Sequence, residues 1–181
     1  MVYEGILEGK FVNLRSVREE DAEFILNIRN NPEISKYLPP LNVTVEQQKN
    51  WIAKQRVDDD SYYFIIEEKG NRRLLGTISV YDIVSNHGES GRLCSIGESY
   101  ESIEAMSLFN SFVFSVLQLD YLSGWVIDEN KAVSSLNKRL GYVSNGRGVS
   151  KEGLECETIV LTKENYLLKA KKIKEIINFF N

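Results

Sequence analysis

The amino-acid sequence predicts one domain of mixed α and β structure, an α+β fold with a single crossover connection. Three observations indicate this fold class. The chain has 181 residues, which suffice for one hydrophobic core but not for two. Strand-like and helical segments alternate along it, and three consecutive strand-like segments follow one another between residues 62 and 96. No internal repeat or low-complexity stretch interrupts this order.

The first half of the chain predicts one strand, two helices and a hairpin. Thr44-x-x-Gln47 has the spacing of a capping box and predicts the start of the second helix. Gly70-Asn71 lies between two runs rich in aromatic and β-branched residues, as in a β-hairpin. The expected elements are a strand at 10–17, helices at 22–30 and 44–56, and strands at 62–67 and 74–83.

The second half centres on a long helix. Apolar residues recur at helical spacing from Ile103 to Leu117, so this helix should be central and largely buried. A strand is expected before it and another strand, a helix and a final hairpin after it. These elements span 88–96, 121–127, 131–140, Tyr142 onward and 157–161, and an amphipathic helix starts at Lys163.

Composition excludes several function classes. The net charge of −4 gives no overall basic field, so a nucleic-acid partner is not expected. No apolar run approaches bilayer length and no signal peptide stands at the N-terminus, which predicts a cytoplasmic protein without a membrane partner. Cys94 and Cys156 are far apart and His87 is the single histidine, so neither a disulfide, a metal site nor a Ser-His-Asp triad is expected.

The junction between the 88–96 strand and the long helix is a candidate ligand site. A helix N-terminus presents unpaired backbone N–H groups and a positive dipole end, which suit a phosphate. Many such junctions bind nothing, so this feature alone does not decide the function.

Three segments resemble the GNAT superfamily of acetyl-CoA-dependent N-acetyltransferases, in particular the branch of the ribosomal-protein alanine acetyltransferases. They are VNLRSVREEDAEFILNIRNNPEISKYL, LLGTISVYDI and IDENKAVSSLNKRLGYVSNG. The resemblance extends to about residue 162. It implies a GNAT fold for residues 1–162, with the helix at 163–181 packed on the same domain, and acetyl-CoA as co-substrate.

The resemblance also implies the cofactor site. In the family, the Asn before the closing helix helps to hold the pantetheine arm, and Asn130 occupies that position here. The backbone N–H groups of Ser102 to Glu104 are expected to receive the pyrophosphate. The other residues expected at the cofactor are Leu93, Cys94, Ser95, Gly97, Ile103, Ala105 and Ser134.

Two departures from the family pattern stand out. GESYESIEA, residues 97–105, replaces the glycine-rich loop and contains no basic residue, while its glutamates would oppose a phosphate. This short loop is similar to that of GNAT members from surface-polysaccharide gene sets. Many members also carry a Tyr seven residues after the Asn to protonate the leaving thiolate, and this chain has Asn137 there. An amide can hydrogen-bond the sulfur but cannot act as an acid.

The implied reaction is direct attack of an amine on the thioester, which needs alignment, carbonyl polarisation and a base. Backbone N–H groups near Leu93 to Ser95 are the candidates for the carbonyl contact. Glu89 is the first candidate for the base, followed by Glu98 and by Ser95 through a water. A carboxylate at a strand edge is more often simply solvated, which is the alternative for Glu89.

Arg29, Asn30 and Tyr81 are the candidate acceptor-binding residues. Arg29 and Asn30 end the first helix beside the loop that borders the acceptor in the family. Arg29 could instead cap its own helix, and Tyr81 could be ordinary packing.

The sequence therefore favours an N-acetyltransferase acting on a small-molecule or peptide amine, with an amino sugar on a nucleotide carrier ahead of a protein N-terminus. The alternative is a GNAT-like domain that has lost acetyl transfer and serves as a binding or assembly module. The final strands and the C-terminal helix could support a homodimer.

Overall fold

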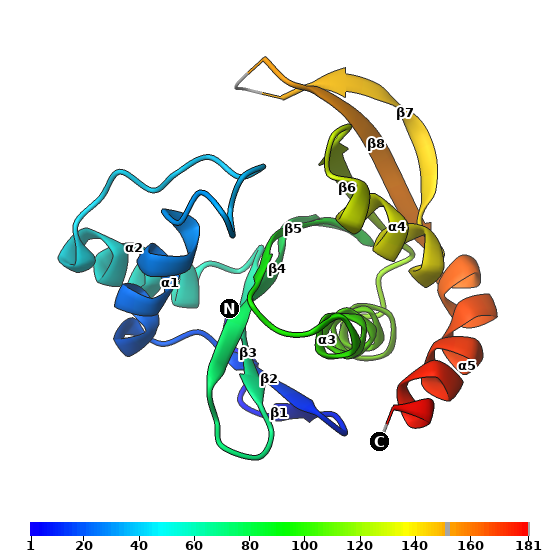
Figure 1. Ribbon diagram of the computed structural model, residues 1–181, viewed down its shortest axis with the longest axis horizontal. Helices are drawn as coiled ribbons and strands as arrows, with labels where there is room; N and C mark the ends of the chain where they lie inside the picture. The colour runs from blue at the N-terminus through cyan, green and yellow to red at the C-terminus, as the bar shows by residue number, and fades with distance from the viewer. Residues whose placement is uncertain (151–152, 181) are drawn as a thin grey trace.

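The computed structural model describes residues 1–150 and 153–180, which form one mixed sheet of eight strands flanked by helices (Figure 1). The expected α and β fold is confirmed. The strand order is β1-β2-β3-β4-β5-β6-β8-β7, and only β5 and β6 pair in parallel. The strands are β1 (Ile6–Glu8), β2 (Val12–Ser16), β3 (Tyr62–Glu68), β4 (Leu74–Val84), β5 (His87–Ser95), β6 (Tyr121–Ile127), β7 (Val143–Val149) and β8 (Glu155–Thr162). The helices are η1 (Glu19–Asp21), α1 (Ala22–Arg29), α2 (Val45–Val57), α3 (Ser99–Ser111), the π-helical turn η2 (Phe112–Val116), α4 (Lys131–Leu140) and α5 (Lys163–Phe179).

The predicted start of the long helix near Ile103 is wrong, because α3 begins at Ser99. The N–H of Glu98 donates to the Glu101 carboxylate at 2.7 Å, and the N–H of Ser102 already donates to the Glu98 carbonyl. This Glu98-x-x-Glu101 pair has capping-box spacing and starts the helix earlier than its apolar face does. Strand β1 was also not predicted, and Asn181, in the expected 163–181 helix, lies outside the described residues.

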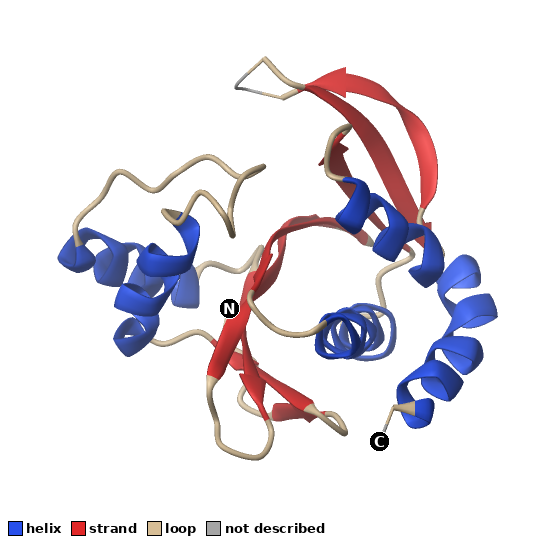
Figure 2. Ribbon diagram, viewed as in Figure 1, coloured by secondary structure: helices blue, strands red, loops and turns tan. Residues whose placement is uncertain are grey.

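Helices cover both faces of the first half of the sheet, as Figure 2 shows. Successive residues of β3 enter two different cores because strand side chains alternate between faces. Phe64 and Ile66 pack in the large core that contains α3, whereas Tyr63 and Ile65 pack with α1 and α2. Burial on both faces explains why β3 has a continuous apolar run. No described helix combines the length and apolarity needed to cross a bilayer.

The sheet divides between β5 and β6. The two strands pair only where residues 87–89 face residues 121–123, and beyond this point β6 pairs with β8 alone. The facing edges of residues 90–95 and 124–127 therefore do not pair with each other, and a space opens between the diverging strands.

A bulge in β5 lies beside this division. The register between β4 and β5 shifts between Thr77 and Ser79, and Arg92 has a left-handed backbone with φ of 53°. The Thr77 hydroxyl donates to the Arg92 carbonyl at 2.8 Å, and the Ser79 hydroxyl donates to the carbonyl of Gly91 at 3.2 Å. A bulge redirects the side chains that follow it, so this one sets the direction of Arg92.

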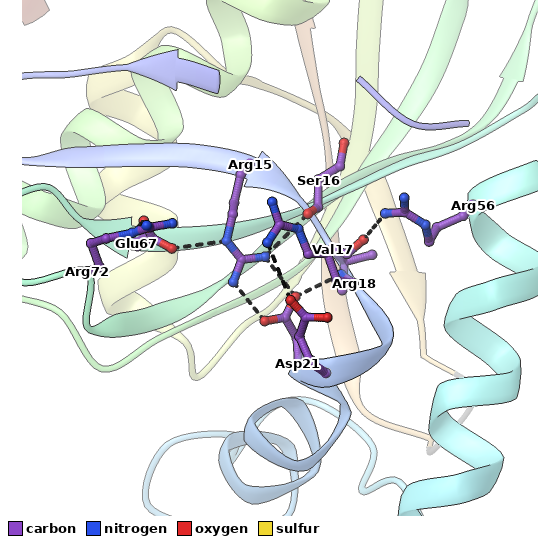
Figure 3. Close-up of polar contacts among 9 residues, drawn as sticks. Arg15, Ser16, Val17, Arg18, Asp21, Arg56, Glu67 and Arg72 are labelled. Carbon is purple, nitrogen blue, oxygen red and sulfur yellow. Dashed lines mark hydrogen bonds and ion pairs between the residues drawn. The ribbon is translucent and has the colours of Figure 1, made fainter. Parts of the chain in front are cut away.

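A buried charge cluster fixes η1 and α1 to the sheet (Figure 3). Arg15 on β2 donates to both carboxylate oxygens of Asp21, at 2.7 and 2.8 Å, and to Glu67 on β3 at 3.0 Å. Burial disfavours its charge, but the bonds and attraction of Asp21 and Glu67 outweigh burial and raise the pKa of Arg15 above its ordinary value. Arg72 also donates to Glu67. The cluster thereby fixes the start of α1 to the sheet.

Replacing Arg15 should strongly destabilise the protein. Arg15→Leu leaves the carboxylates of Asp21 and Glu67 buried beside an apolar side chain, which should lower the free energy of unfolding by about 3 kcal/mol in urea titrations. Arg18→Gln is the matched control, since the Arg18 side chain makes only an exposed ion pair with Glu20, and should cost under about 1 kcal/mol. Equal losses in both variants would contradict the role given to the cluster.

Candidate active site

A long groove runs between the end of β5, the start of α3 and one side of α4, and encloses about 530 Å³. We call it the cofactor groove because residues that the family resemblance places at the cofactor, Leu93 and Asn130 among them, line it. Two cations, Lys36 and Arg139, and one carboxylate, Glu33, stand among its lining residues. The remaining lining residues are Ile34, Ser35, Tyr37, Leu38, Leu93, Cys94, Ser95, Ser99, Ser102, Ile103, Asn130, Ala132, Val133, Ser135 and Leu136.

The space between the diverging strands is a smaller pocket of about 110 Å³, which we call the splay pocket. Leu93, Asn130 and Val133 line both it and the cofactor groove, so the two spaces are continuous. Tyr81 and Arg92 line it from the β4–β5 side, together with Ile78, Ser90 and Gly91, and Met106 lines it from α3. Gly124, Trp125, Val126, Ile127, Asn137 and Ile159 line it from the other side, and Tyr37 and Leu38 complete it.

A tyrosine and a carboxylate form a hydrogen-bonded pair at this pocket. The Tyr81 hydroxyl donates to Glu89 at 2.6 Å. Burial, followed by the bond to Glu89, raises the pKa of Tyr81 above its ordinary value. A β-carbon on Gly91 would lie 2.6 Å from the Tyr81 hydroxyl oxygen, so only glycine lets the phenol approach β5 this closely. Tyr81 lines the pocket, whereas Glu89 does not and is connected to it through the hydroxyl of Tyr81.

A third cavity, of about 450 Å³, lies among α1, α2 and the sheet. We call it the arginine cavity because Arg29 and Arg92 both line it, with Lys54. The Arg92 guanidinium lies 4.3 Å from the ring centre of Tyr81 and 5.3 Å from that of Trp51. Its other lining residues are Leu41, Val43, Gln47, Gln48, Asn50, Trp51 and Tyr63. Arg92 also lines the splay pocket and so connects the two spaces.

Residues 12–143 match the family described as an acetyltransferase (GNAT) domain. The chain belongs to the GNAT acetyltransferases. It is therefore an acyltransferase, as the resemblance implied.

Two curated relatives are similar to it over most of their length. The acetyltransferase PseH of Campylobacter jejuni is 21% identical over 121 residues, 67% of this chain and 76% of PseH. The uncharacterized N-acetyltransferase YoaA of Bacillus subtilis is 28% identical over 155 residues, 78% of this chain and 84% of YoaA.

Solved GNAT structures share the fold. Apo FdhC, described as a nucleotide-linked sugar GNAT, superposes with a TM-score of 0.81 at 24% identity and covers 97% of this chain and 98% of its own. Spermidine N-acetyltransferase of Vibrio cholerae, in complex with CoA and spermine, superposes with a TM-score of 0.78 at 19% identity, over 88% of this chain and 99% of its own.

Most of the residues expected at the cofactor come together in the cofactor groove. Leu93, Cys94, Ser95, Ser102, Ile103 and Asn130 line it. Gly97, Glu104, Ala105 and Ser134 are not among its lining residues. Ala105 is fully buried in the core, and Ser134 lines a shallow hollow beside Lys138 and Tyr142.

The backbone N–H groups of Ser102 to Glu104, which were expected to receive the pyrophosphate, lie within α3. Because α3 begins at Ser99, these residues lie past its first three positions, where backbone N–H groups bond to carbonyls four residues back. The Glu104 carboxylate has a structural partner instead. It accepts hydrogen bonds from the N–H groups of Lys10, Phe11 and Val12 at 2.6 to 2.9 Å and holds the β1–β2 connection.

The remaining predicted residues take different positions. Arg29 lines the arginine cavity and Tyr81 the splay pocket. Asn30 does not line either space, because its amide exchanges two hydrogen bonds with the backbone of Leu41. Asn137 is 6% exposed at the splay pocket, and none of the described residues hydrogen-bonds its amide. Cys94 is buried as expected, and burial raises the pKa of its thiol.

The sequence did not identify Arg92, Arg139 or Tyr37. The Tyr37 hydroxyl donates to the Glu129 carbonyl at 3.1 Å and joins the loop after α1 to the turn before α4. The one sequence signal for Arg92 is that it is a charged residue within the otherwise small and apolar run GRLCS.

Gly76 should be indispensable for the bulge that directs Arg92. A β-carbon at Gly76 would lie 2.1 Å from the Cys94 carbonyl oxygen, a backbone atom that cannot move aside. Gly76→Ala should therefore lower the free energy of unfolding by about 2 kcal/mol in urea titrations. Gly70→Ala is the control, because nothing lies within 4 Å of its added β-carbon, and should change stability by less than about 0.5 kcal/mol. An unaffected Gly76→Ala protein would show that the bulge tolerates a side chain.

Proposed function

We propose that this GNAT enzyme transfers the acetyl group of acetyl-CoA to a primary amine by direct attack. As acceptor we propose an amino sugar on a nucleotide carrier, ahead of a protein N-terminus. The observation that carries the proposal is that residues 92–95 of β5 border all three spaces, the cofactor groove, the splay pocket and the arginine cavity. Two ligands held in the outer spaces would meet at this strand. The similarity to FdhC, a nucleotide-linked sugar GNAT, supports the acceptor class.

The cofactor groove has the features that acetyl-CoA requires. Apolar side chains of Val133 and Leu136 can face the pantetheine arm, and the Asn130 amide can donate to it. The Asn130 side-chain oxygen is already used, since it accepts from the N–H of Val133 and caps α4. For the phosphates the groove offers the side chains of Lys36 and Arg139.

The pocket residues can then perform each step of the transfer. The acceptor nitrogen attacks the thioester carbon while a backbone N–H of residues 93–95 donates to the carbonyl oxygen. The proton lost by the nitrogen passes to the Tyr81 oxygen as the hydroxyl hydrogen of Tyr81 moves to Glu89. Collapse of the intermediate expels the thiolate, to which the Asn137 amide can donate a hydrogen bond.

Calorimetric titration with acetyl-CoA tests the cofactor assignment. The enzyme should bind acetyl-CoA, and Asn130→Ser should bind it about fivefold more weakly because it loses one amide hydrogen bond. Serine retains an N-cap oxygen, so the stability of α4 should hold. Asn137→Ala, by contrast, should lower turnover and leave this affinity unchanged. Absence of binding at millimolar acetyl-CoA would overturn the proposed function, and unchanged binding in Asn130→Ser would overturn the pantetheine contact.

Turnover tests the proton path. Glu89→Gln should lower kcat about 100-fold, because the amide cannot accept the proton, while acetyl-CoA affinity stays the same. Tyr81→Phe should match it, since the path runs through both groups. The control is Asp82→Asn, which removes a neighbouring exposed carboxylate that bonds to neither. A normal kcat in Glu89→Gln would exclude Glu89 as the base.

A further inference from the structure

We propose that the arginine cavity binds a phosphate or diphosphate group of the acceptor, held between Arg29 and Arg92. The inference rests on the proposed function and names the chemistry by which the acceptor is recognised. It requires that the cavity be built for an anion, that its cations be unpaired within the protein, and that a bound anion lie near the reaction centre.

The charge of the cavity is opposite to that of the chain. Its lining contains three cations, Arg29, Lys54 and Arg92, and no carboxylate. The chain as a whole has a net charge of −4. Cations gathered without acids in one concave space attract an anion and raise its local concentration.

None of these cations forms an ion pair within the described part of the chain. Arg92 donates to the Ser79 hydroxyl and packs on aromatic rings. Arg29 donates once, to the Pro39 carbonyl at 2.7 Å. These contacts leave the positive charge uncompensated.

Arg29 gives the most direct indication of a missing ligand. It is 7% exposed, and its Nε is buried without any hydrogen-bond partner. Burial lowers the pKa of Arg29, and repulsion from Arg92 acts in the same direction. A buried guanidinium with an unbonded nitrogen and no ion-pair partner is costly, and an anion in the cavity would offset that cost. Arg15 is buried to a similar extent, but its ion pairs with Asp21 and Glu67 neutralise its charge.

The anion would be multiply charged. A single carboxylate leaves most of three positive charges unbalanced, whereas the diphosphate that joins a sugar to a nucleotide carries two negative charges and has several acceptor oxygens for two guanidinium forks. A polyamine would instead be repelled. The cavity therefore favours a different acceptor from spermine, which the Vibrio cholerae enzyme holds.

The position of Arg92 connects this subsite to the chemistry. Arg92 lines the splay pocket as well as the arginine cavity, and it packs on the Tyr81 ring at 4.3 Å. An anion on Arg92 would place the attached amine beside the Tyr81 hydroxyl. The subsite thus positions the acceptor in addition to binding it.

Direct binding tests the subsite. Titration of the full chain with UDP and with inorganic pyrophosphate, at saturating CoA so that the cofactor groove is filled, should give saturable binding that weakens as salt is raised. Arg29→Gln and Arg92→Gln should each weaken binding at least tenfold. Lys49→Gln, which changes a partly buried cation on α2 outside the cavity lining, is the control and should bind as the wild type does.

A second measurement covers variants that fold poorly. Arg92 is only partly buried, so Arg92→Gln should keep the wild-type unfolding transition even if Arg29→Gln does not. Thiol release should be faster with phosphate-bearing amines, such as glucosamine 1-phosphate, than with glucosamine or spermidine, and Arg92→Gln should abolish that preference.

The outcomes separate the two proposals. If acetyl-CoA binds and neutral amines, carboxylate-bearing amines or polyamines react as well as phosphate-bearing ones, the subsite is overturned and the function stands. If acetyl-CoA does not bind, the function fails, and pyrophosphate binding that depends on Arg29 still supports the anion site. If pyrophosphate binds equally to wild type and both arginine variants, the anion lies elsewhere and the proposal is overturned.

Discussion

The incomplete pairing of β5 with β6 is the constraint on which the functional part of the molecule depends. The strands are held together by residues 87–89 and 121–123 and then diverge, because β6 continues on β8 while β5 follows β4. Backbone groups in a sheet normally bond to the next strand, so a strand that loses its neighbour offers these groups to a ligand. The splay pocket opens at this point, and the cofactor groove and arginine cavity meet it through Leu93 and Arg92.

Two buried arginines show how the same residue type serves different ends. Arg15 is satisfied by Asp21 and Glu67, so its charge contributes to holding α1 on the sheet. Arg29, at the end of that helix, has a single carbonyl partner and an unbonded Nε. The first cluster fixes the position of the helix, and the helix then presents an uncompensated charge to the cavity. The ion pairs of Arg15 at the start of α1 stabilise the protein, whereas the unpaired Arg29 at its end lowers stability. Such a loss of stability is common at binding sites.

The sequence predicted what depends on neighbours in the chain. Apolar periodicity and turn residues located nearly every helix and strand, and the Asn130 to Tyr142 segment identified the family. The sequence did not predict side-chain positions that depend on contacts between residues far apart in the chain. Arg92 points into the site because β4 and β5 fall out of register at Thr77, and Glu104 bonds to a turn more than 90 residues away. Neither pairing leaves a local pattern. The start of α3 was not predicted either, because it rests on the bond from the N–H of Glu98 to the Glu101 carboxylate and not on a Ser, Thr, Asp or Asn N-cap.

The acidic segment at residues 97–105, most of which lies in α3, opposes phosphate binding less than its composition indicates. Of its three glutamates, Glu101 bonds to the N–H of Glu98 and is 3% exposed, and Glu104 is turned toward β2. Neither lines the cofactor groove, whose cations come from the loop after α1 and from α4 instead. Positive side chains from other elements, such as Lys36 and Arg139, can replace a basic residue in the loop itself. Electrostatic attraction depends on distance and not on sequence position. Loss of the glycine-rich loop is therefore compatible with a retained cofactor site.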